Sequence, residues 1–191
     1  MKIKTYGKQN GVDLKRRMLN KLSTYVEKNS TLVDMGCGEN WVKTTPIGKK
    51  CIVTGFDPFD SNADVVAKID INDDWVKQHQ SYFDVGVALH SLHFGDTKTV
   101  LNNITLAMGL LKKHSYCYLS INQDRVDDRE GFITVDYRKK HNDWFKRINE
   151  LFHIEANHLI TGEKKEFPTG RWKTKYPNGR YGSHHFIIQR G

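Results

Sequence analysis

The sequence predicts an α/β domain with a mostly parallel sheet and helices on both faces. Short apolar segments of strand length alternate with longer stretches whose apolar residues recur at helical spacing, which is typical of successive βαβ units. The chain has 191 residues, the size of one compact domain. Residues 1–160 contain no repeat, low-complexity segment or Pro/Gly/Ser-rich linker. We therefore expect a single domain over residues 1–191.

Seven strands are predicted from runs of β-branched and other apolar residues bounded by polar residues or glycine. They are Thr31–Met35, Cys51–Phe56, Val65–Ile69, Phe83–Leu89, Ser115–Ile121, Phe152–Leu159 and His184–Gln189. The clearest helical patterns are Asp13–Lys28, Thr97–Lys112 and Lys139–Leu151. Alternation of this kind places a ligand at the carboxyl ends of the parallel strands.

The last two predicted strands are joined differently. Residues 161–183 contain six glycines and prolines, so no helix fits there. Neighbouring strands joined by a loop without a crossover run antiparallel. We therefore expect the last strand to be the antiparallel one.

The net charge of +8 is concentrated in two segments. Residues 1–30 hold eight Lys/Arg against two acids, and residues 161–183 hold six against two. A near-neutral body with a basic N-terminal helix region and a basic loop suits a polyanionic partner, although such segments can also serve solubility alone.

Apolar runs are too short to span a bilayer, and the first residues lack the apolar segment of a signal peptide. Three cysteines, an odd number, are expected in or beside buried strands as reduced thiols. The sequence thus favours an intracellular, cytoplasmic protein without membrane association.

Acidic residues and glycines follow the first two predicted strands. Asp34-Met35-Gly36-Cys37-Gly38 closes the first strand, where the glycines let the backbone approach a ligand and Asp34 can orient its ammonium group. A nicotinamide-binding loop would need a glycine where this chain has Trp41. Asp57 ends the second strand, where a carboxylate can accept both hydroxyls of a ribose, and Asp60 is a rival for that role.

The loop resembles the D/E-x-G-x-G motif of class I S-adenosylmethionine-dependent methyltransferases. Their Rossmann-like sheet of seven strands, with the last inserted antiparallel, is similar to the order predicted here. The resemblance implies an enzyme with S-adenosylmethionine as cofactor. It also implies that Asp70, or Asp73 in its place, accepts from the adenine amino group. On the first predicted helix, Lys15, Arg16, Arg17 and Lys21 could meet RNA phosphates or approach the methionyl carboxylate. The family often has a further glycine at Asn40, so the next helix is expected to begin irregularly.

Residues 83–94 resemble the fourth strand of the mRNA cap guanine-N7 methyltransferases. Phe83-Asp84 and His93-Phe94 match without a gap, with Phe94 in place of a tyrosine and Leu89 in place of a glutamine. The resemblance implies that Leu89 contacts the cofactor and that His93 and Phe94 line the transfer site. Guanine N7 carries no proton, so transfer needs positioning and no catalytic base.

The loop 161–183 carries aromatic residues among its basic ones, which suits the stacking of a base beside a triphosphate. We expect Trp172, Tyr176, Tyr181 and the following His184 to contact a capped RNA. No metal is expected, because His90-x-x-His93 and His184-His185 lack a cysteine or carboxylate at matching spacing. Isolated cap-like motifs in a short chain are consistent with a viral protein. The alternatives are a small-molecule or tRNA methyltransferase and a non-catalytic RNA-binding module of the same fold.

Overall fold

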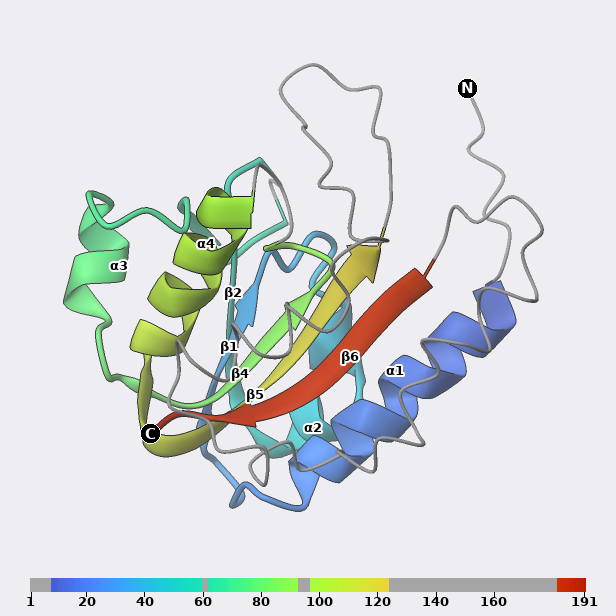
Figure 1. The fold of residues 1–191 in the computed structure, drawn as a ribbon. Helices are drawn as coiled ribbons and strands as arrows, with labels where there is room; N and C mark the ends of the chain where they lie inside the picture. The colour runs from blue at the N-terminus through green and yellow to red at the C-terminus, as the bar shows by residue number, and fades with distance from the viewer. Residues whose placement is uncertain (1–7, 60–61, 93–96, 124–181) are drawn as a thin grey trace.

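A computed structural model describes residues 8–59, 62–92, 97–123 and 182–191 (Figure 1). Its elements in chain order are α1 (Lys8–Ser23), β1 (Thr31–Met35), the 3-10 helix η1 (Trp41–Thr44), α2 (Pro46–Lys50), β2 (Ile52–Asp57), β3 (Val65–Val66), α3 (Asp74–Gln78), β4 (Phe83–Leu89), α4 (Thr97–Gly109), β5 (Leu111–Gln123) and β6 (Gly182–Gln189).

The strands form one sheet in the order β3-β2-β1-β4-β5-β6. Every pairing is parallel except that of β6, which runs antiparallel to β5 from Gln123↔Gly182 to Tyr116↔Gln189. This confirms the predicted α/β fold with its antiparallel last strand. The predicted strand at 152–159, the predicted helix at 139–151 and the loop 161–181 lie outside the described residues, so six strands are described of the seven predicted.

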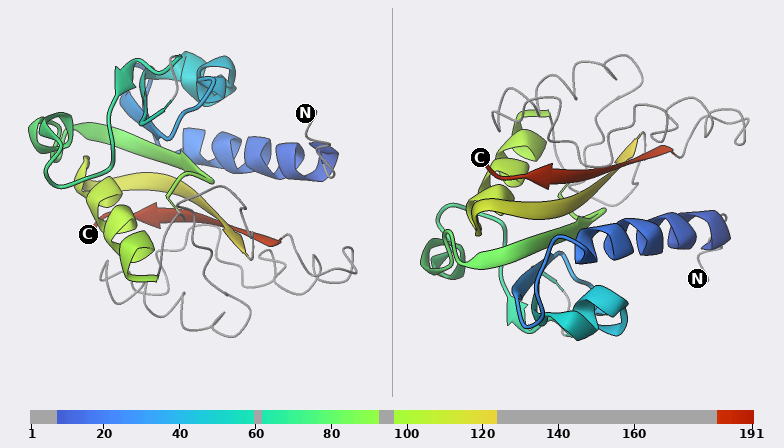
Figure 2. Two further views of the ribbon diagram at one scale, coloured as in Figure 1. Left: turned by 90° about the horizontal axis from the view of Figure 1, so that it is seen from above. Right: turned by 90° about the horizontal axis from the view of Figure 1, so that it is seen from below.

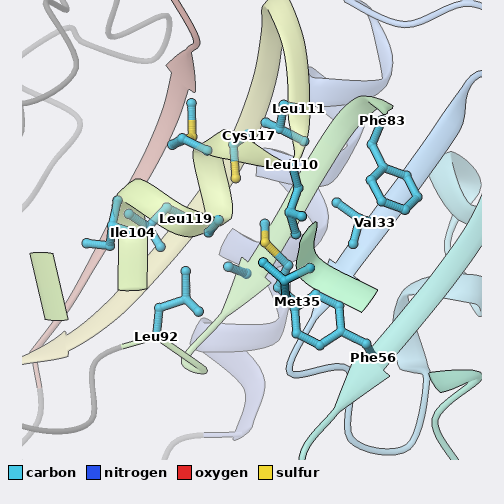
Figure 3. Close-up of a cluster of buried hydrophobic side chains, with 14 of the residues drawn as sticks. Val33, Met35, Phe56, Phe83, Leu92, Ile104, Leu110, Leu111, Cys117 and Leu119 are labelled. Atoms are coloured by element: carbon cyan, nitrogen blue, oxygen red, sulfur yellow. The ribbon is translucent and has the colours of Figure 1, made fainter. Parts of the chain in front are cut away.

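Helices cover both faces of the sheet, as predicted (Figure 2). On one face, Leu19 of α1 and Ile47 of α2 pack with apolar side chains of the strands, including Leu32 of β1 and Tyr118 of β5. On the other face, Val76 of α3 and the apolar residues of α4 pack against the strand residues that point to that side of the sheet. Figure 3 shows this second cluster, in which Val33, Met35, Phe56, Ile104 and Leu119 are labelled. Burial of each such side chain contributes about 1.5 to 3 kcal/mol.

Two of the predicted strands have the predicted first and last residues, and the other strands differ. β1 and β4 have the predicted bounds, whereas β3 stops at Val66 instead of Ile69. The carboxylate of Asp73 accepts a hydrogen bond from the backbone N–H of Lys68 (3.3 Å), so a side chain takes a donor that a longer strand would use in its ladder. β5 is longer than predicted at both ends: its first residue, Leu111, pairs with Phe83 of β4, and its last two, Asn122 and Gln123, pair with β6.

α1 ends at Ser23, five residues before the predicted end at Lys28. The backbone N–H groups of Thr24 and Tyr25 bond back to the carbonyls of Lys21 and Leu22, which closes the helix in a turn. Asn29 then adopts φ +67° before β1 begins. None of the described helices combines the length and apolar character needed to cross a bilayer.

Arg190, next to the end of β6, ties the last strand to distant parts of the chain. Its Nη1 donates to the carbonyls of Gly109 (3.0 Å) and Leu111 and to Oγ of Ser81 (3.0 Å). Gly109 is the last residue of α4, so the guanidinium satisfies a carbonyl at a helix end that lacks an intrahelical partner.

The strand order reverses beside β1. The chain leaves β1 toward β2 and β3 on one side, and then crosses to β4 on the other side. In open α/β sheets, ligands bind at this switch point, beyond the carboxyl ends of the strands. The residues that follow β1, β2 and β4 therefore define the candidate site.

Candidate functional site

Two glycines shape the turn after β1. Gly36 has φ +69° and Gly38 has φ +50°, both in the left-handed region that favours glycine. A Cβ atom on Gly36 would lie 2.2 Å from Cβ of Ser91, the second residue after β4. The Ser91 hydroxyl donates to the carbonyl of Met35, which holds the two loops together. The glycine at 36 is thus required by packing inside the protein, besides any need for a ligand to approach.

Asn40 has φ +56° and ψ +34°, so it also occupies the left-handed region. This is the position at which the resembling family often has glycine, and asparagine is among the residues that best tolerate this conformation. The chain then forms the 3-10 helix η1 before α2 begins at Pro46, with Oγ1 of Thr45 accepting from the N–H of Gly48 (3.3 Å). The predicted irregular start of this helix is confirmed.

Asp57 is the last residue of β2 and links that strand to the glycine turn. Its Oδ2 accepts from the N–H of Gly38 (3.2 Å) and its Oδ1 from the N–H of Phe59 (2.9 Å). The sequence therefore placed this carboxylate correctly, at the carboxyl edge beside the turn. Its rival Asp60 lies outside the described residues.

Asp70 and Asp73 follow β3 and differ in what their oxygens do. Both oxygens of Asp73 accept backbone N–H groups, Oδ1 those of Trp75 and Val76 and Oδ2 that of Lys68, so this residue caps α3. Asp70 is exposed and its Oδ1 accepts from the N–H of Asn72 (2.8 Å). Of the two, Asp70 has the side chain that a ligand could reach.

Asp34, in β1, is only 2% exposed. Burial raises the pKa of its carboxyl to about 7, an effect that Lys43 opposes and the carboxylates of Asp57 and Asp64 reinforce. Among the described residues none donates a hydrogen bond to it. A carboxylate this buried without a donor is costly to keep ionised, so a cationic ligand would stabilise it.

An ion pair that the sequence analysis missed braces the same region. Lys43 of η1 lies 2.5 Å from Oδ1 of Asp64, whose Oδ2 accepts from the N–H of Gly55 in β2 (2.7 Å). Burial alone would raise the pKa of Asp64, but the hydrogen bonds from Lys43 and Gly55 hold it below its ordinary value. No sequence pattern joins positions 43 and 64, because only the fold brings them together.

Cys37, inside the turn, is not a nucleophile. Burial, followed by the nearby carboxylates of Asp34, Asp57 and Asp64, raises the pKa of its thiol to about 12. Because the thiolate is the reactive form, this cysteine acts as a small apolar residue.

The end of β4 is held from both sides. Leu89 closes the strand, and the N–H of the following His90 donates to the carbonyl of Ser120 in β5 (3.0 Å) and to its hydroxyl (3.1 Å). His90 has φ +60°, which is uncommon for a residue with a Cβ and is often found where a site imposes a conformation. The sequence analysis considered His90 only as a metal ligand and missed this constrained position.

Two exposed apolar side chains flank the carboxylates and were also missed. Phe59, two residues after Asp57, is 82% exposed, and Ile71, next to Asp70, is 56% exposed. Single exposed apolar side chains are common on protein surfaces, so exposure alone does not assign these two to a ligand. Their position next to the predicted ribose and adenine acids is the signal that could have identified them.

Several predicted site residues cannot be located. His93, Phe94, Trp172, Tyr176 and Tyr181 lie outside the described residues, and for His184 only the backbone, paired with Ile121, is described. Within the described ranges, no three or more His, Cys, Asp or Glu side chains come together as a metal site would require.

Lys21 lies in the last turn of α1, close to the amino edge of the sheet. The carbonyl of Ser23, two residues later, accepts from Nζ of Lys50 (2.8 Å), and Lys50 ends the helix that precedes β2. Asp34 and Gly36 lie at the opposite, carboxyl edge. The cofactor contact of Lys21 stays a prediction that its position does not favour.

No family model and no curated protein matches the sequence. Solved structures do match the fold. The [4+2]-cyclase SpnF matches with a TM-score of 0.56 and 10% identity, over 98% of this chain and 84% of that chain. A SAM-dependent methyltransferase from Archaeoglobus fulgidus has a TM-score of 0.54 and 13% identity, over 93% and 94%.

A third similar structure is the 1,6-didemethyltoxoflavin-N1-methyltransferase of Burkholderia thailandensis, with bound 1,6-didemethyltoxoflavin and S-adenosylhomocysteine. Its TM-score is 0.51 at 12% identity, over 97% of this chain and 83% of that chain. The chain therefore has the Rossmann-like fold of S-adenosylmethionine-dependent methyltransferases. Because a cyclase shares this fold, the function has to be argued from the site.

Proposed function

We propose that the chain is an S-adenosylmethionine-dependent methyltransferase. The observation that carries the proposal is the hydrogen bond from Gly38 to Asp57, which joins the glycine turn after β1 to a carboxylate at the end of β2. The two elements needed for an adenosyl ligand thus meet at the switch point of the sheet.

The residues present fit this cofactor. The buried Asp34 carboxylate, which lacks a donor among the described residues, suits the methionyl ammonium group, directly or through water. Asp57 would accept from the ribose hydroxyls and Asp70 from the adenine amino group. Phe59 and Ile71 have exposed apolar side chains beside these acids, which would contact the adenine.

When bound, S-adenosylmethionine supplies a methyl group made electrophilic by a positively charged sulfur. The chain's own residues bind and orient it. Asp34 experiences the negative charges of Asp57 and Asp64 and the positive charge of Lys43, so acids outnumber bases around it and the site attracts a cation. The loop of Leu89, His90 and Ser91 is fixed against β1 and β5, which favours a rigid wall on the acceptor side.

For the acceptor, we propose guanine N7 of an RNA cap. Support comes from the resemblance of residues 83–94 to the cap guanine-N7 enzymes and from the basic, aromatic segment 161–183. A ring nitrogen with a free lone pair requires alignment with the methyl carbon and no proton removal. His93 and Phe94 would line this approach, with Trp172, Tyr176, Tyr181 and His184 contacting the capped RNA.

A small-molecule acceptor is the second candidate. The Burkholderia enzyme of similar fold is named as an N1-methyltransferase of 1,6-didemethyltoxoflavin, so that protein methylates a nitrogen of a small molecule. The same cofactor site would serve either acceptor.

Two measurements test the proposal in sequence. Calorimetry with S-adenosylhomocysteine should show binding that Asp57→Ala weakens at least tenfold, while Asp74→Ala, an exposed aspartate of α3, leaves it unchanged. Absence of binding to the wild-type protein would contradict the cofactor and favour a non-catalytic module.

The protein is next incubated with radiolabelled S-adenosylmethionine and GpppA-capped RNA, and the RNA is digested to nucleosides. Label on 7-methylguanosine supports the cap acceptor. If the protein binds the cofactor but no labelled guanine appears, the RNA cap is not the acceptor. The small-molecule acceptor then remains, and incubation with a metabolite extract tests it.

A further inference from the structure

Charge is segregated within the described part of the chain. Residues 15–50, which include most of α1 and all of η1 and α2, hold eight Lys/Arg against three acids. Residues 51–59 and 62–90, which include β2, β3, α3 and β4, hold two lysines against six aspartates. Residues 97–123 and 182–191 hold a further four Lys/Arg and no acid, of which Lys112 pairs with Asp84 and Arg190 donates to the carbonyl of Gly109. The larger of the two positive groups therefore belongs to the helices on one face of the sheet.

α1 and α2 pack side by side over the same apolar cluster, in which Leu19 and Leu22 of α1 meet Ile47 of α2 (Figure 1). Basic side chains of these helices and of the segment after α1 form a surface that we call the α1–α2 face. It comprises Arg16, Arg17 and the half-buried Lys21 of α1, Lys28 after α1, and Lys49 of α2.

Among the residues whose side chains the structure describes, no acid pairs with the positive charges of this face. The ion pairs seen in the described ranges involve Lys43, Lys77 and Lys112, and none involves a residue of the α1–α2 face. Of the three acids in residues 15–50, Asp34 is buried beneath the surface, which leaves Glu27 and Glu39 exposed. A mobile anion layer or a polyanion must therefore balance the five charges.

The residues around the α1–α2 face argue against two kinds of partner, a membrane surface and a second copy of the chain. A membrane surface would call for exposed apolar side chains beside the basic ones. In the described residues, the two large apolar side chains of highest exposure, Phe59 and Val66, belong to β3 and the loop before it. Ile52, the third, follows α2 and is a single apolar side chain at the start of β2. Tyr25, the one beside α1, has its ring 4.8 Å from that of Tyr116. Docking of a second copy is opposed by the net charge of +8 on each.

We propose that the α1–α2 face binds the phosphate backbone of a nucleic acid. Each nucleotide carries one negative charge, so a strand can meet several of these side chains at once and release its condensed counterions. Arg16 and Arg17 present planar guanidinium groups that suit phosphate oxygens. The inference goes beyond methyl transfer, since it concerns a surface of α1 and α2 and requires neither cofactor nor cap.

Fluorescence anisotropy of the full chain with an uncapped, labelled RNA oligonucleotide tests this at several salt concentrations. The double variant Arg16→Glu/Arg17→Glu should bind at least about tenfold more weakly. The slope of log affinity against log salt concentration should also be smaller in this variant. Each lost phosphate contact lowers the slope by about 0.7, so the loss of two lowers it by roughly 1 to 1.5.

Lys68→Glu/Lys77→Glu is the matched control. It changes the net charge by the same amount, but its exposed lysines lie on the acidic side of the molecule. This variant should lose less than about threefold. Equal losses in both variants would reduce the effect to overall charge and overturn the proposal, as would full affinity in the arginine variant.

The glutamate variant could lose binding because it fails to fold. The neutral variant Arg16→Gln/Arg17→Gln tests for this: it should unfold at the wild-type temperature and still bind the RNA more weakly. Capture by phosphatidylserine vesicles with no binding of RNA would assign the face to a membrane and overturn the proposal. Because the RNA is uncapped and no cofactor is added, a failure of methyl transfer would leave this result unaffected.

Discussion

Gly36 and Ser91 lie in direct contact across the switch point, with space for a hydrogen but none for a methyl group at residue 36. The contact couples the turn after β1 to the segment after β4. Any substitution at Gly36 must displace that segment or abandon the left-handed turn.

Gly36→Ala should therefore lower the free energy of unfolding by about 2 to 4 kcal/mol, from left-handed strain and overpacking together. Urea denaturation measures this. The double variant Gly36→Ala/Ser91→Gly should recover the part due to the clash, because it removes the Cβ that the alanine meets. Additive effects of the two substitutions would contradict the contact.

Asp34→Asn should stabilise the protein above neutral pH. The folded-state pKa of Asp34 is raised from 3.8 to about 7, so its contribution to stability is fully present below pH 4 and is lost as the pH rises to 7. At pH 8 the neutral amide should gain roughly 2 to 4 kcal/mol over the wild type, and at pH 4 the two should be equal. Thermal or urea unfolding at both pH values decides this, and a destabilised variant at pH 8 would contradict the assignment.

Binding of S-adenosylhomocysteine should weaken as the pH falls below about 7. Protonation of Asp34 removes the negative charge that the ligand's ammonium group would meet. Calorimetry in buffers of different ionisation enthalpy should show proton release on binding near pH 6. In Asp34→Asn, affinity should be low and independent of pH over this range; a wild-type profile retained in that variant would assign the titration to another group.

Phe59→Ala should weaken cofactor binding without loss of stability, because the side chain is 82% exposed. Stacking on a base is worth about 1 to 3 kcal/mol, which corresponds to roughly 5- to 150-fold in affinity. Val66→Ala is the control, because Val66 is an apolar side chain on β3 that is 71% exposed, and this variant should bind the cofactor normally. If both variants bind as the wild type does, Phe59 does not contact the adenine.

Strands that are buried on both faces were predictable from local sequence. β1 and β4 consist of nearly continuous apolar residues, so their bounds follow from composition. β3 is short and exposed at the sheet edge, and its end depends on a hydrogen bond from Lys68 to Asp73 that no strand pattern contains.

In the candidate site, too, some residues were predicted from the sequence and others were not. Asp34, Gly36, Gly38 and Asp57 were found because parallel strands bring their carboxyl ends together, whatever the loops between them do. The Lys43–Asp64 pair and the constrained backbone of His90 arise from contacts between elements distant in sequence. Spacing alone carries no information about such contacts.

The bonds of Arg190 bear on the order in which the molecule folds. They join β6 to Ser81, Gly109 and Leu111, residues separated from it by about 80 to 110 positions. Contacts of such long range carry a large loop-closure cost and form late. The edge of β5 therefore stays open for pairing until β6 arrives, which makes it the part of the nascent sheet most in need of protection against aggregation.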